Sequence, residues 1–318
     1  AVVELTSPGG LRDAGWLARA APAQRASAST VANAKLLQLA VKRCSRRLLV
    51  AFPAGATGID GAARDTFVRD QLPALYNELW DLALDADKTS LDCVVLLEPV
   101  ASFLERGSAA GADAVEVVWS AGPTISSCTP DAELQMAKAD LRVESLGDEL
   151  QEELFGVSYV LYDNINERLP QFAKVAVGGT FDHFHNGHKK LLSITAAVTT
   201  QEIVCGITGA SMLKDKKFGD RIETIEERKE SVLLFLNSVA SPSLNLNLVT
   251  IDDPWGPTVV DDEIEAIVVS TEVLKGARLI NEERARRGFK PLQVVAVARS
   301  NAYTLSSTFV RRRQQAAM

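Results

Sequence analysis

Short apolar runs alternate with amphipathic segments from about residue 172 to the end of the chain. Continuous apolar runs of about four to eight residues are typical of strands that are covered on both faces of a sheet. Residues 225–239 carry apolar side chains at helical spacing, which predicts a helix packed on one face. The continuous apolar runs predict strands at residues 173–177, 203–207, 266–269 and 292–297, and the alternation of apolar and polar residues predicts a further strand at residues 244–251. This regular alternation predicts an α/β fold with a doubly wound parallel sheet.

The first half of the chain also alternates strands and helices, but less regularly. The expected strands are residues 48–52, 93–97 and 115–119, and the expected helices are residues 74–84 and 131–153. This pattern predicts a smaller α/β domain. Polar and turn residues from 164 to 170 separate two apolar stretches, as at a domain boundary. We therefore expect an N-terminal domain over residues 1–165 and a second domain over residues 166–318.

The composition limits the classes of function that are open to the chain. With 318 residues and 47% hydrophobic content, the chain is long enough to build two cores. The net charge of −7 provides no basic field for nucleic acid. The apolar runs stop well short of the roughly 20 residues that span a bilayer, so no membrane partner is expected. The cysteines form no CxxC pair, which is typical of free thiols in a reducing compartment: they are Cys44, Cys93, Cys128 and Cys205.

One local bias bears on the compartment. No acidic residue occurs between Asp13 and Asp60, and the stretch is rich in Ala, Ser, Lys and Arg, as in a mitochondrial targeting segment. The same stretch runs directly into the apolar strand at residues 48–52, which favours a surface helix of a folded domain. We expect a cytoplasmic protein, with a mitochondrial location as the alternative.

The densest chemistry lies in residues 175–192, where a strand, a glycine pair and a helix start follow one another. Gly178 and Gly179 are expected to let the backbone turn tightly and approach a ligand closely. The stretch holds all three histidines of the chain, which are His183, His185 and His188. His185 and His188 are three positions apart at the helix entrance, so both imidazoles can face the space above the strand. Free N–H groups at a helix start favour an anion in that space.

Two other interpretations of this stretch stay open at the level of sequence. A solvated turn could collect the histidines by chance, although a turn has no reason to gather every histidine of a chain. Alternatively, His183, His185 and His188 could supply three nitrogen ligands to zinc. Neighbouring side chains on a turn rarely converge tetrahedrally, and no cysteine lies nearby to complete the set. We therefore favour an anion site without a protein-bound metal.

A second helix start follows the last expected strand. Residues 305–311 read Leu-Ser-Ser-Thr-Phe-Val-Arg, and the hydroxyls and N–H groups of such a start suit a phosphate. Arg311, one turn further on, adds a bidentate phosphate donor. A plain N-cap is the alternative, since Ser and Thr are common before helices. Because both helix starts belong to one sheet, we expect them to hold a triphosphate between them.

Other segments carry weaker signals. Residues 212–217 form a basic loop after the second strand of the sheet, which could reach over the site or be a solvated charge run. Residues 253–257 predict a stiff turn whose Trp255 walls a ligand or caps the core. Residues 55–61 are rich in glycine, but no Lys-Ser or Lys-Thr pair follows, so they predict an ordinary loop and not a P-loop.

The two motifs resemble a known family. Residues 185–188, His-Asn-Gly-His, resemble the HxGH motif of the nucleotidylyltransferase superfamily, and residues 178–188 are similar to the phosphopantetheine adenylyltransferases of archaea and eukaryotes. Residues 305–311 are similar to the Ile/Leu-Ser-Ser-Thr-x-x-Arg motif of adenylyl-transferring members. The resemblance covers the second half of the chain well and the first half weakly. It implies a Rossmann-like fold and transfer of AMP from ATP to 4′-phosphopantetheine, giving dephospho-CoA and pyrophosphate in coenzyme A biosynthesis.

The resemblance also implies roles for individual residues. His188 would stabilise charge in the transition state, while Lys216 and Thr180 would hold the acceptor phosphate. The implied catalytic residues are His188, His185 and Lys216. The implied nucleotide-binding residues are Gly178, Gly179, Thr180, Phe181, His185, His188, Ser306, Ser307, Thr308 and Arg311. The implied acceptor-binding residues are Thr180, Lys214, Lys216 and Glu272.

The helix start after the fourth strand is a weaker match. Residues 269–273 resemble the family pattern VSxET, but Val273 replaces the usual threonine, which weakens any hydroxyl role at that position. Arg284, further along this segment, is expected either to contact a phosphate or to lie on a helix surface. Mg²⁺ is expected on the triphosphate, without a dedicated protein ligand.

Other functions stay open beside this one. Nicotinamide-mononucleotide adenylyltransferases share similar motifs, whereas cytidylyltransferases fit less well because they lack this form of the second motif. A nucleotide-binding scaffold could instead recruit other enzymes of the coenzyme A pathway through the N-terminal domain. Animal CoA synthases resemble the chain but add a P-loop kinase domain, and since no P-loop motif occurs here, the resemblance implies a one-step enzyme. The expected partners are ATP and 4′-phosphopantetheine.

Overall fold

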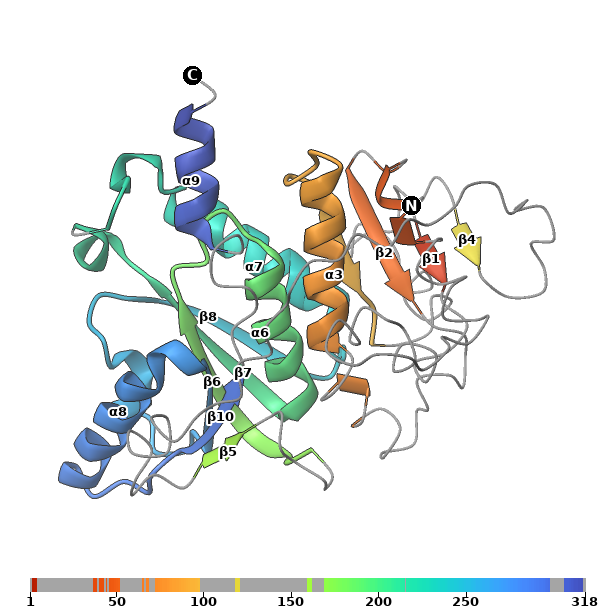
Figure 1. The fold of residues 1–318 in the computed structure, drawn as a ribbon. Coiled ribbons are helices and arrows are strands. Elements are labelled where there is room, and N and C mark those ends of the chain that lie inside the picture. Colours follow the sequence, from red (N-terminus) through yellow and green to blue (C-terminus); the bar gives the residue numbers. More distant parts are fainter. Residues whose placement is uncertain are drawn as a thin grey trace, which may run out of the picture. The chain divides into compact units, whose positions relative to one another are not determined.

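The computed structural model describes residues 2–4, 37–38, 40–42, 44, 46–51, 65, 67–68, 72–97, 118–120, 159–161, 169–214, 216–297 and 306–316 of the chain. Contacts divide the chain into two compact units (Figure 1). The first unit comprises residues 1–67 and 74–147, and the second comprises residues 68–73 and 148–318. Among the residues just given, no helix combines the length and the apolar character needed to cross a membrane.

The first unit contains a parallel sheet of four strands in the order β3-β2-β1-β4. The strands are β1 (Val2–Glu4), β2 (Arg47–Ala51), β3 (Asp92–Val95) and β4 (Val118–Ser120). Helix α3 (Leu72–Asp85) packs on it, and its Tyr76 hydroxyl accepts a hydrogen bond from the N–H of Val95 (3.2 Å). The predicted smaller α/β domain is confirmed. Residues 55–61 and 131–153 lie outside the described residues.

The second unit contains a parallel sheet of six strands in the order β5-β10-β9-β6-β7-β8. The strands are β5 (Tyr159–Leu161), β6 (Phe172–Gly179), β7 (Thr199–Thr208), β8 (Asn245–Ile251), β9 (Ala266–Ser270) and β10 (Gln293–Val297). Every neighbouring pair is parallel, and the five strands that the sequence predicts are confirmed. The fold of this unit is a Rossmann-like doubly wound sheet.

Strand β5 extends the sheet at one edge. It pairs with β10, with Val160 opposite Val295. It lies before the domain boundary expected between residues 165 and 166, yet it belongs to the second sheet. A second domain that keeps its whole sheet therefore begins before Tyr159.

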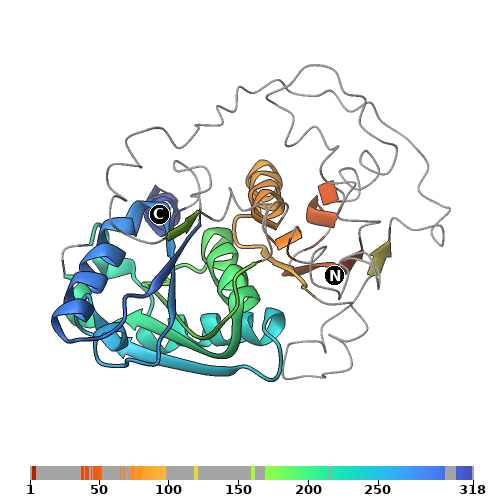
Figure 2. The ribbon, with the colours of Figure 1, turned by 90° about the horizontal axis from the view of Figure 1, so that it is seen from below.

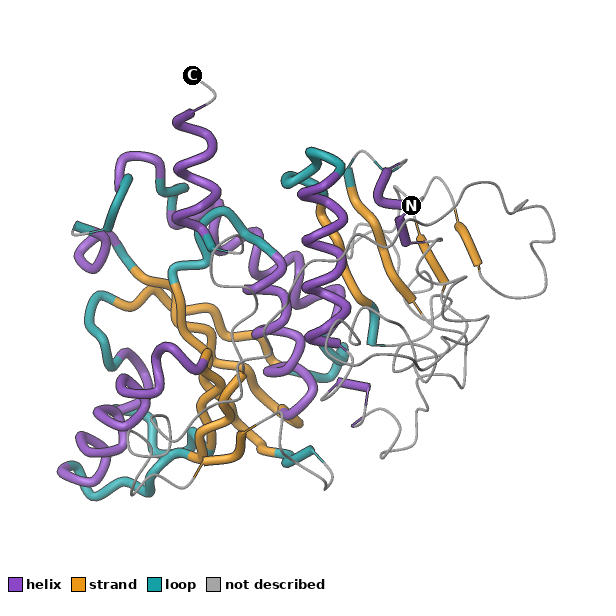
Figure 3. Tube along the Cα trace, viewed as in Figure 1, coloured by secondary structure: helices purple, strands orange, loops and turns teal. Residues whose placement is uncertain are grey.

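Helices cover both faces of the second sheet (Figure 2), as the purple helices around the orange strands in Figure 3 also show. The first two, α6 (Asn186–Val198) and α7 (Ile225–Val239), pack against each other. Helix α8 (Leu274–Arg286) covers the opposite face, where Leu274 and Ala277 join an apolar cluster with Ile267 and Val269 of β9. Because side chains alternate along a strand, Val268 between them points to the other face. The last helix is α9 (Ser307–Ala316).

Arg284 on α8 has a structural position that the sequence did not indicate. Its side chain is fully buried, and it donates hydrogen bonds to the backbone carbonyls of Lys290 (2.7 Å) and Asp261 (2.9 Å). Both expectations for this residue, a phosphate contact and a surface position, were therefore wrong. The buried guanidinium donates hydrogen bonds to backbone carbonyls that have no partner within the sheet.

Of the two roles expected for Trp255, a wall for a ligand and a cap on the core, its position fits the cap on the core. It packs against the apolar cluster beneath α8. The turn before it is held by Asp253, whose Oδ1 accepts hydrogen bonds from the N–H groups of Trp255 and Gly256, both at 2.8 Å. Residues 253–257 thus form the stiff turn that their composition predicts.

The strand order determines where a ligand can bind. Strand β6 lies between β7 and β9, so the chain winds away from β6 in opposite directions on its two sides. In sheets of this kind, ligands bind beyond the carboxyl ends of the strands at this switch point. The stretch that holds the histidines begins at that end of β6.

Candidate functional site

The candidate site is built on the loop that leaves the carboxyl end of β6. Gly178 and Gly179 belong to the strand itself and neither has a positive φ, so the expected glycine turn was wrong. The turn is made by Phe181 (φ 52°) and His183 (φ 47°), in the left-handed region that most residues avoid. Gly179 allows close packing, because a Cβ there would lie only 3.2 Å from the ring of Phe181.

The two histidines of residues 185–188 cap helix α6 at its start. His185 is the N-cap, and its Nδ1 accepts a hydrogen bond from the N–H of Gly187 (3.1 Å). His188 Nδ1 accepts one from the backbone N–H of His185 (3.4 Å). Because both Nδ1 atoms are acceptors, each neutral ring carries its hydrogen on Nε2. The rings stack with their centroids 3.9 Å apart, so the structure brings the two predicted histidines together.

His188 is held in its neutral form. Burial lowers the pKa of His188 well below its usual 6.5, and the repulsion that a protonated His185 beside it would exert acts in the same direction. The rings of Phe181 and Phe184 flank it, with centroids 5.3 Å and 5.6 Å away. The Phe181 side chain is itself fully buried, so any contact of that residue with a nucleotide has to come from its backbone. The neutral His188 ring keeps its Nε2–H as a hydrogen-bond donor.

Helix α9 begins beside the histidine pair. Ser306 Oγ accepts a hydrogen bond from the N–H of Phe309 (3.2 Å), which is the N-cap considered for this motif. Ser307 Oγ donates to the carbonyl of Asp182 (2.6 Å) and lies 3.4 Å from Nε2 of His185. Since the hydroxyl hydrogen goes to the carbonyl, His185 donates its Nε2–H to Ser307. The two predicted helix starts therefore meet, although 122 positions separate His185 from Ser307.

Asp182 ties the loop after β6 to its surroundings. Its carboxylate is fully buried and forms an ion pair with Nη1 of Arg311. Its Oδ1 also accepts hydrogen bonds from Nδ1 of His183 (2.9 Å) and from the N–H of Glu223 (3.0 Å). Burial alone would raise the pKa of Asp182, but the bonds from His183, Glu223 and Arg311 outweigh it and hold the pKa below its usual 3.8. Sequence reasoning gave this residue no role.

Arg311 therefore has a partner that the sequence did not predict. Only 3% of the residue is exposed, and Nη2 lies 3.3 Å from the hydroxyl of Thr308. Its Nε is buried and has no hydrogen-bond partner among the described residues. The guanidinium thus fixes the start of α9 against Asp182 and retains one N–H for an anion.

Arg228 on α7 is a second residue that the sequence did not single out. It is 1% exposed, and its Nη1 donates to the carbonyls of Thr180 (2.8 Å) and Thr208 (2.9 Å). The hydroxyl of Thr208 donates to that of Thr180 (3.1 Å), so Thr180 lies within this bonded group. An arginine on an amphipathic helix is normally predicted to face solvent. Arg228 contacts the ends of β6 and β7 because of the order of the strands in the sheet, which no local sequence pattern shows.

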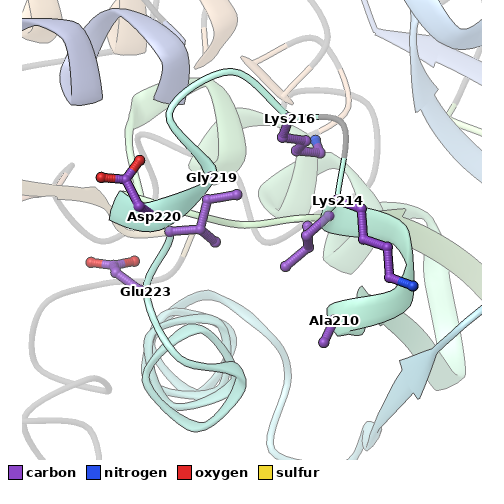
Figure 4. Close-up of a pocket in the computed structure, with 8 residues that line it drawn as sticks. Ala210, Lys214, Lys216, Gly219, Asp220 and Glu223 are labelled. Carbon is purple, nitrogen blue, oxygen red and sulfur yellow. The ribbon is translucent and has the colours of Figure 1, made fainter.

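The basic loop borders a hollow of about 490 Å³ (Figure 4). Lys214 and Lys216 lie on one side of it, and the carboxylates of Asp220 and Glu223 on the other. Partial burial, followed by the positive charge of Arg311, lowers the pKa of Lys216. The Lys214 side chain extends away from the two carboxylates (Figure 4). The acceptor role of both lysines stays a prediction.

Glu272 and Val273 lie at the carboxyl ends of the strands, as the histidines do, but they follow a different strand. They belong to the 3₁₀ turn Thr271–Val273, which directly follows β9, the neighbour of β6. Both are exposed, with 48% of Val273 accessible. An acceptor role for Glu272 also stays a prediction.

The described residues do not bring the three histidines together as zinc ligands. In the described part of the chain, the only group of three or more residues whose potential ligand atoms lie within 4.8 Å of one another is Asp182, His183 and Glu223. In that group the Asp182 carboxylate already accepts bonds from Arg311, His183 and the Glu223 N–H. His185 and His188 use their Nδ1 atoms to cap α6. This geometry favours the anion site over the zinc alternative.

Comparison with known proteins finds relatives of the second unit. The family model described as cytidylyltransferase-like matches residues 176–313. The phosphopantetheine adenylyltransferase of Saccharomyces cerevisiae is 41% identical over 145 residues, which are 44% of this chain and 47% of that protein. An uncharacterized protein of Schizosaccharomyces pombe is 41% identical over 147 residues, 43% of this chain and 46% of that protein. The chain thus spans about half the length of these two relatives.

An archaeal relative is matched over nearly its whole length. The phosphopantetheine adenylyltransferase of Pyrobaculum aerophilum is 39% identical over 149 residues, 45% of this chain and 92% of that protein. The family match runs from β6 into α9, so it contains both helix starts of the site. These relatives confirm the resemblance that the two motifs predict.

Proposed function

Because this chain belongs to the phosphopantetheine adenylyltransferase family, we propose that it transfers AMP from ATP to 4′-phosphopantetheine, giving dephospho-CoA and pyrophosphate. The observation that carries the proposal is the meeting of two helix starts, with His185 Nε2 of α6 at 3.4 Å from Ser307 Oγ of α9. The N–H groups and the positive dipole ends of two helices at one place suit the several phosphates of one nucleotide.

The proposed chemistry needs no protein nucleophile. An oxygen of the acceptor phosphate attacks the α-phosphorus of ATP, the new O–P bond forms, and the bond to the β-phosphate oxygen breaks with pyrophosphate leaving. The protein then contributes positioning and neutralisation of charge. Both are supplied in advance by groups that are fixed before the substrate arrives.

The proposed roles follow from the hydrogen-bond donors that remain at the site. His188 would donate its Nε2–H to the charge that develops on the α-phosphate, and its low pKa keeps the ring in the neutral form with that single hydrogen. Ser307 and the Nε of Arg311 would face the β and γ phosphates. Lys216 and Thr180 would hold the acceptor phosphate on the β7 side.

Mg²⁺ belongs to the proposal as the companion of ATP. The potential ligand group of Asp182, His183 and Glu223 does not fit as its holder, because the Asp182 carboxylate is buried and already accepts bonds from Arg311, His183 and the Glu223 N–H. No step is therefore assigned to a protein-bound ion, and Mg²⁺ would be held by oxygens of the triphosphate.

A pyrophosphate-release assay on the full chain tests the proposal. We expect release with ATP and 4′-phosphopantetheine, and a rate at least about tenfold lower when CTP replaces ATP or nicotinamide mononucleotide replaces the acceptor. Release with nicotinamide mononucleotide in preference to 4′-phosphopantetheine would assign the alternative acceptor. Release that depends on CTP would assign cytidylyl transfer. A folded chain that binds ATP but releases no pyrophosphate with any pair would favour the scaffold function.

The first unit has a proposed role of its own. It holds none of the residues assigned to the reaction, and we propose that it associates with other enzymes of the coenzyme A pathway. A cytoplasmic location is part of the same proposal, because the basic stretch before residue 48 runs directly into an apolar strand, as in a folded domain.

A further inference from the structure

A single guanidinium joins the ends of the two strands beneath the site. The ladder between β6 and β7 ends with Gly179 opposite Ile207, and the next residues on each strand are Thr180 and Thr208. Their carbonyls both accept hydrogen bonds from Nη1 of Arg228, at 2.8 Å and 2.9 Å. Arg228 therefore fixes the spacing of the two strand ends just beyond the last residue pair that the sheet itself holds.

The same guanidinium reaches the loop before α7. Its Nε donates to the carbonyl of Glu223 (3.0 Å). The Glu223 carboxylate in turn accepts the backbone N–H of His183 (2.8 Å), which is one of the two residues with positive φ in the turn after β6. A non-glycine residue keeps such a conformation only where its surroundings hold it. Glu223, held by Arg228, supplies that restraint.

The network continues to the second helix start. The N–H of Glu223 donates to Asp182 (3.0 Å), and Asp182 pairs with Arg311 on α9. Arg228, Glu223, Asp182 and Arg311 thus form one chain of bonds from α7 to α9, in which only Glu223 is partly exposed. Each link joins a separate element, so the spacing of α6 and α9 depends on all of them.

We propose that Arg228 is a positioning residue for the adenylyl transfer, and the inference rests on the proposed function. It does not touch the substrate in this role. It holds the ends of β6 and β7 and, through Glu223, the turn that leads into His185 and His188. The two helix starts are thereby kept at the separation that one nucleotide requires, where an error of about 1 Å can cost about 10²-fold in rate.

The chain offers a matched control in Arg284. It is fully buried like Arg228, and it also donates to backbone carbonyls, those of Lys290 and Asp261. It lies on α8, on the other face of the sheet. Its hydrogen bonds go to the carbonyls of Lys290, Thr258, Asp261 and Ile264, and none of these residues belongs to the loop after β6. A role that is only structural would give the two arginines the same behaviour on substitution.

The test compares Arg228→Lys with Arg284→Lys in the full chain. Lysine keeps the positive charge but lacks the planar guanidinium. In Arg228→Lys, a single ammonium group therefore cannot donate to the carbonyls of Thr180, Thr208 and Glu223 in the same geometry. We expect both variants to lose similar thermal stability, but only Arg228→Lys to lower kcat, by about 10²-fold, with a much smaller change in KM for ATP. Amide hydrogen exchange should rise over residues 180–188 in Arg228→Lys alone and stay unchanged over residues 266–270 of β9.

Equal losses of kcat in the two variants, or unchanged exchange over residues 180–188 in Arg228→Lys, would overturn the positioning role. If the unmodified chain transfers no AMP, the proposed function fails, and the exchange comparison decides the positioning role by itself. Should Arg228→Lys not fold, Glu223→Ala removes the acceptor of the His183 N–H and keeps both strand-end bonds. The proposal then requires the same selective rise in exchange, and its absence overturns the proposal.

Discussion

Replacing His188 with alanine is expected to lower kcat for AMP transfer by about 10²–10³-fold, because one donor aimed at developing charge contributes about 2.7–4 kcal/mol. The side chain also accepts the backbone N–H of His185 at the start of α6, so its loss should lower the free energy of unfolding by about 0.5–2 kcal/mol. Steady-state kinetics and thermal denaturation on the same preparation separate the two effects. An unchanged kcat in the folded variant would remove His188 from the mechanism.

Glu227→Ala provides the control for the lost cap. Glu227 occupies on α7 the same third position that His188 occupies on α6, and its Oε2 accepts the N–H of Thr224 (2.8 Å). The substitution removes a capping side chain but no imidazole, so stability should fall by a similar amount while kcat stays within about twofold. If Glu227→Ala lowered kcat as far as His188→Ala does, the effect of His188 would belong to the helix start and not to charge stabilisation.

Replacing Arg311 with methionine is expected to lower the free energy of unfolding by about 3–5 kcal/mol, since it leaves the fully buried Asp182 carboxylate without its ion partner. AMP transfer should fall below detection even below the unfolding transition, because α9 loses its anchor and the site loses the Nε donor. Urea denaturation followed by circular dichroism measures the first effect, and pyrophosphate release measures the second.

The double variant Asp182→Asn with Arg311→Met separates charge burial from anchoring. It removes both charges, so we expect it to recover much of the lost stability but none of the activity. A loss of no more than about 1 kcal/mol in Arg311→Met, the value typical of exposed pairs, would contradict the buried pair as a structural anchor. Recovery of activity in the double variant would contradict the role of Arg311 at the phosphates.

Four strands of the second sheet could be predicted because helices cover both of their faces, so that each reads as a largely apolar run: β6, β7, β9 and β10. The edge strand β8 could be predicted because apolar and polar residues alternate along it. Strands β1 and β5 were not among the predicted strands, because each has three residues and gains its stability from a partner far along the chain. The position of β5 in the second sheet depends on its pairing with β10, which no local pattern shows.

The candidate site also contains residues that could be predicted from the sequence and residues that could not. His185, His188, Ser306 and Ser307 could be predicted, because each lies at a helix start whose local sequence marks it. Residues whose importance comes from distant bonds could not be found, such as Asp182, which meets a partner 129 positions away in Arg311. The predicted glycine turn was wrong because Gly179 has no positive φ and instead allows the ring of Phe181 to pack closely against it.

Pyrophosphorolysis of dephospho-CoA tests the function of the two helix starts most directly. The full chain is incubated with Mg²⁺, pyrophosphate and dephospho-CoA, and the ATP formed is measured by luciferase luminescence. We predict ATP formation that requires both substrates and falls by about 10²–10³-fold in His188→Ala. ATP formation from NAD and pyrophosphate but not from dephospho-CoA, or no ATP from either with folded protein, would contradict transfer of AMP to 4′-phosphopantetheine at this site.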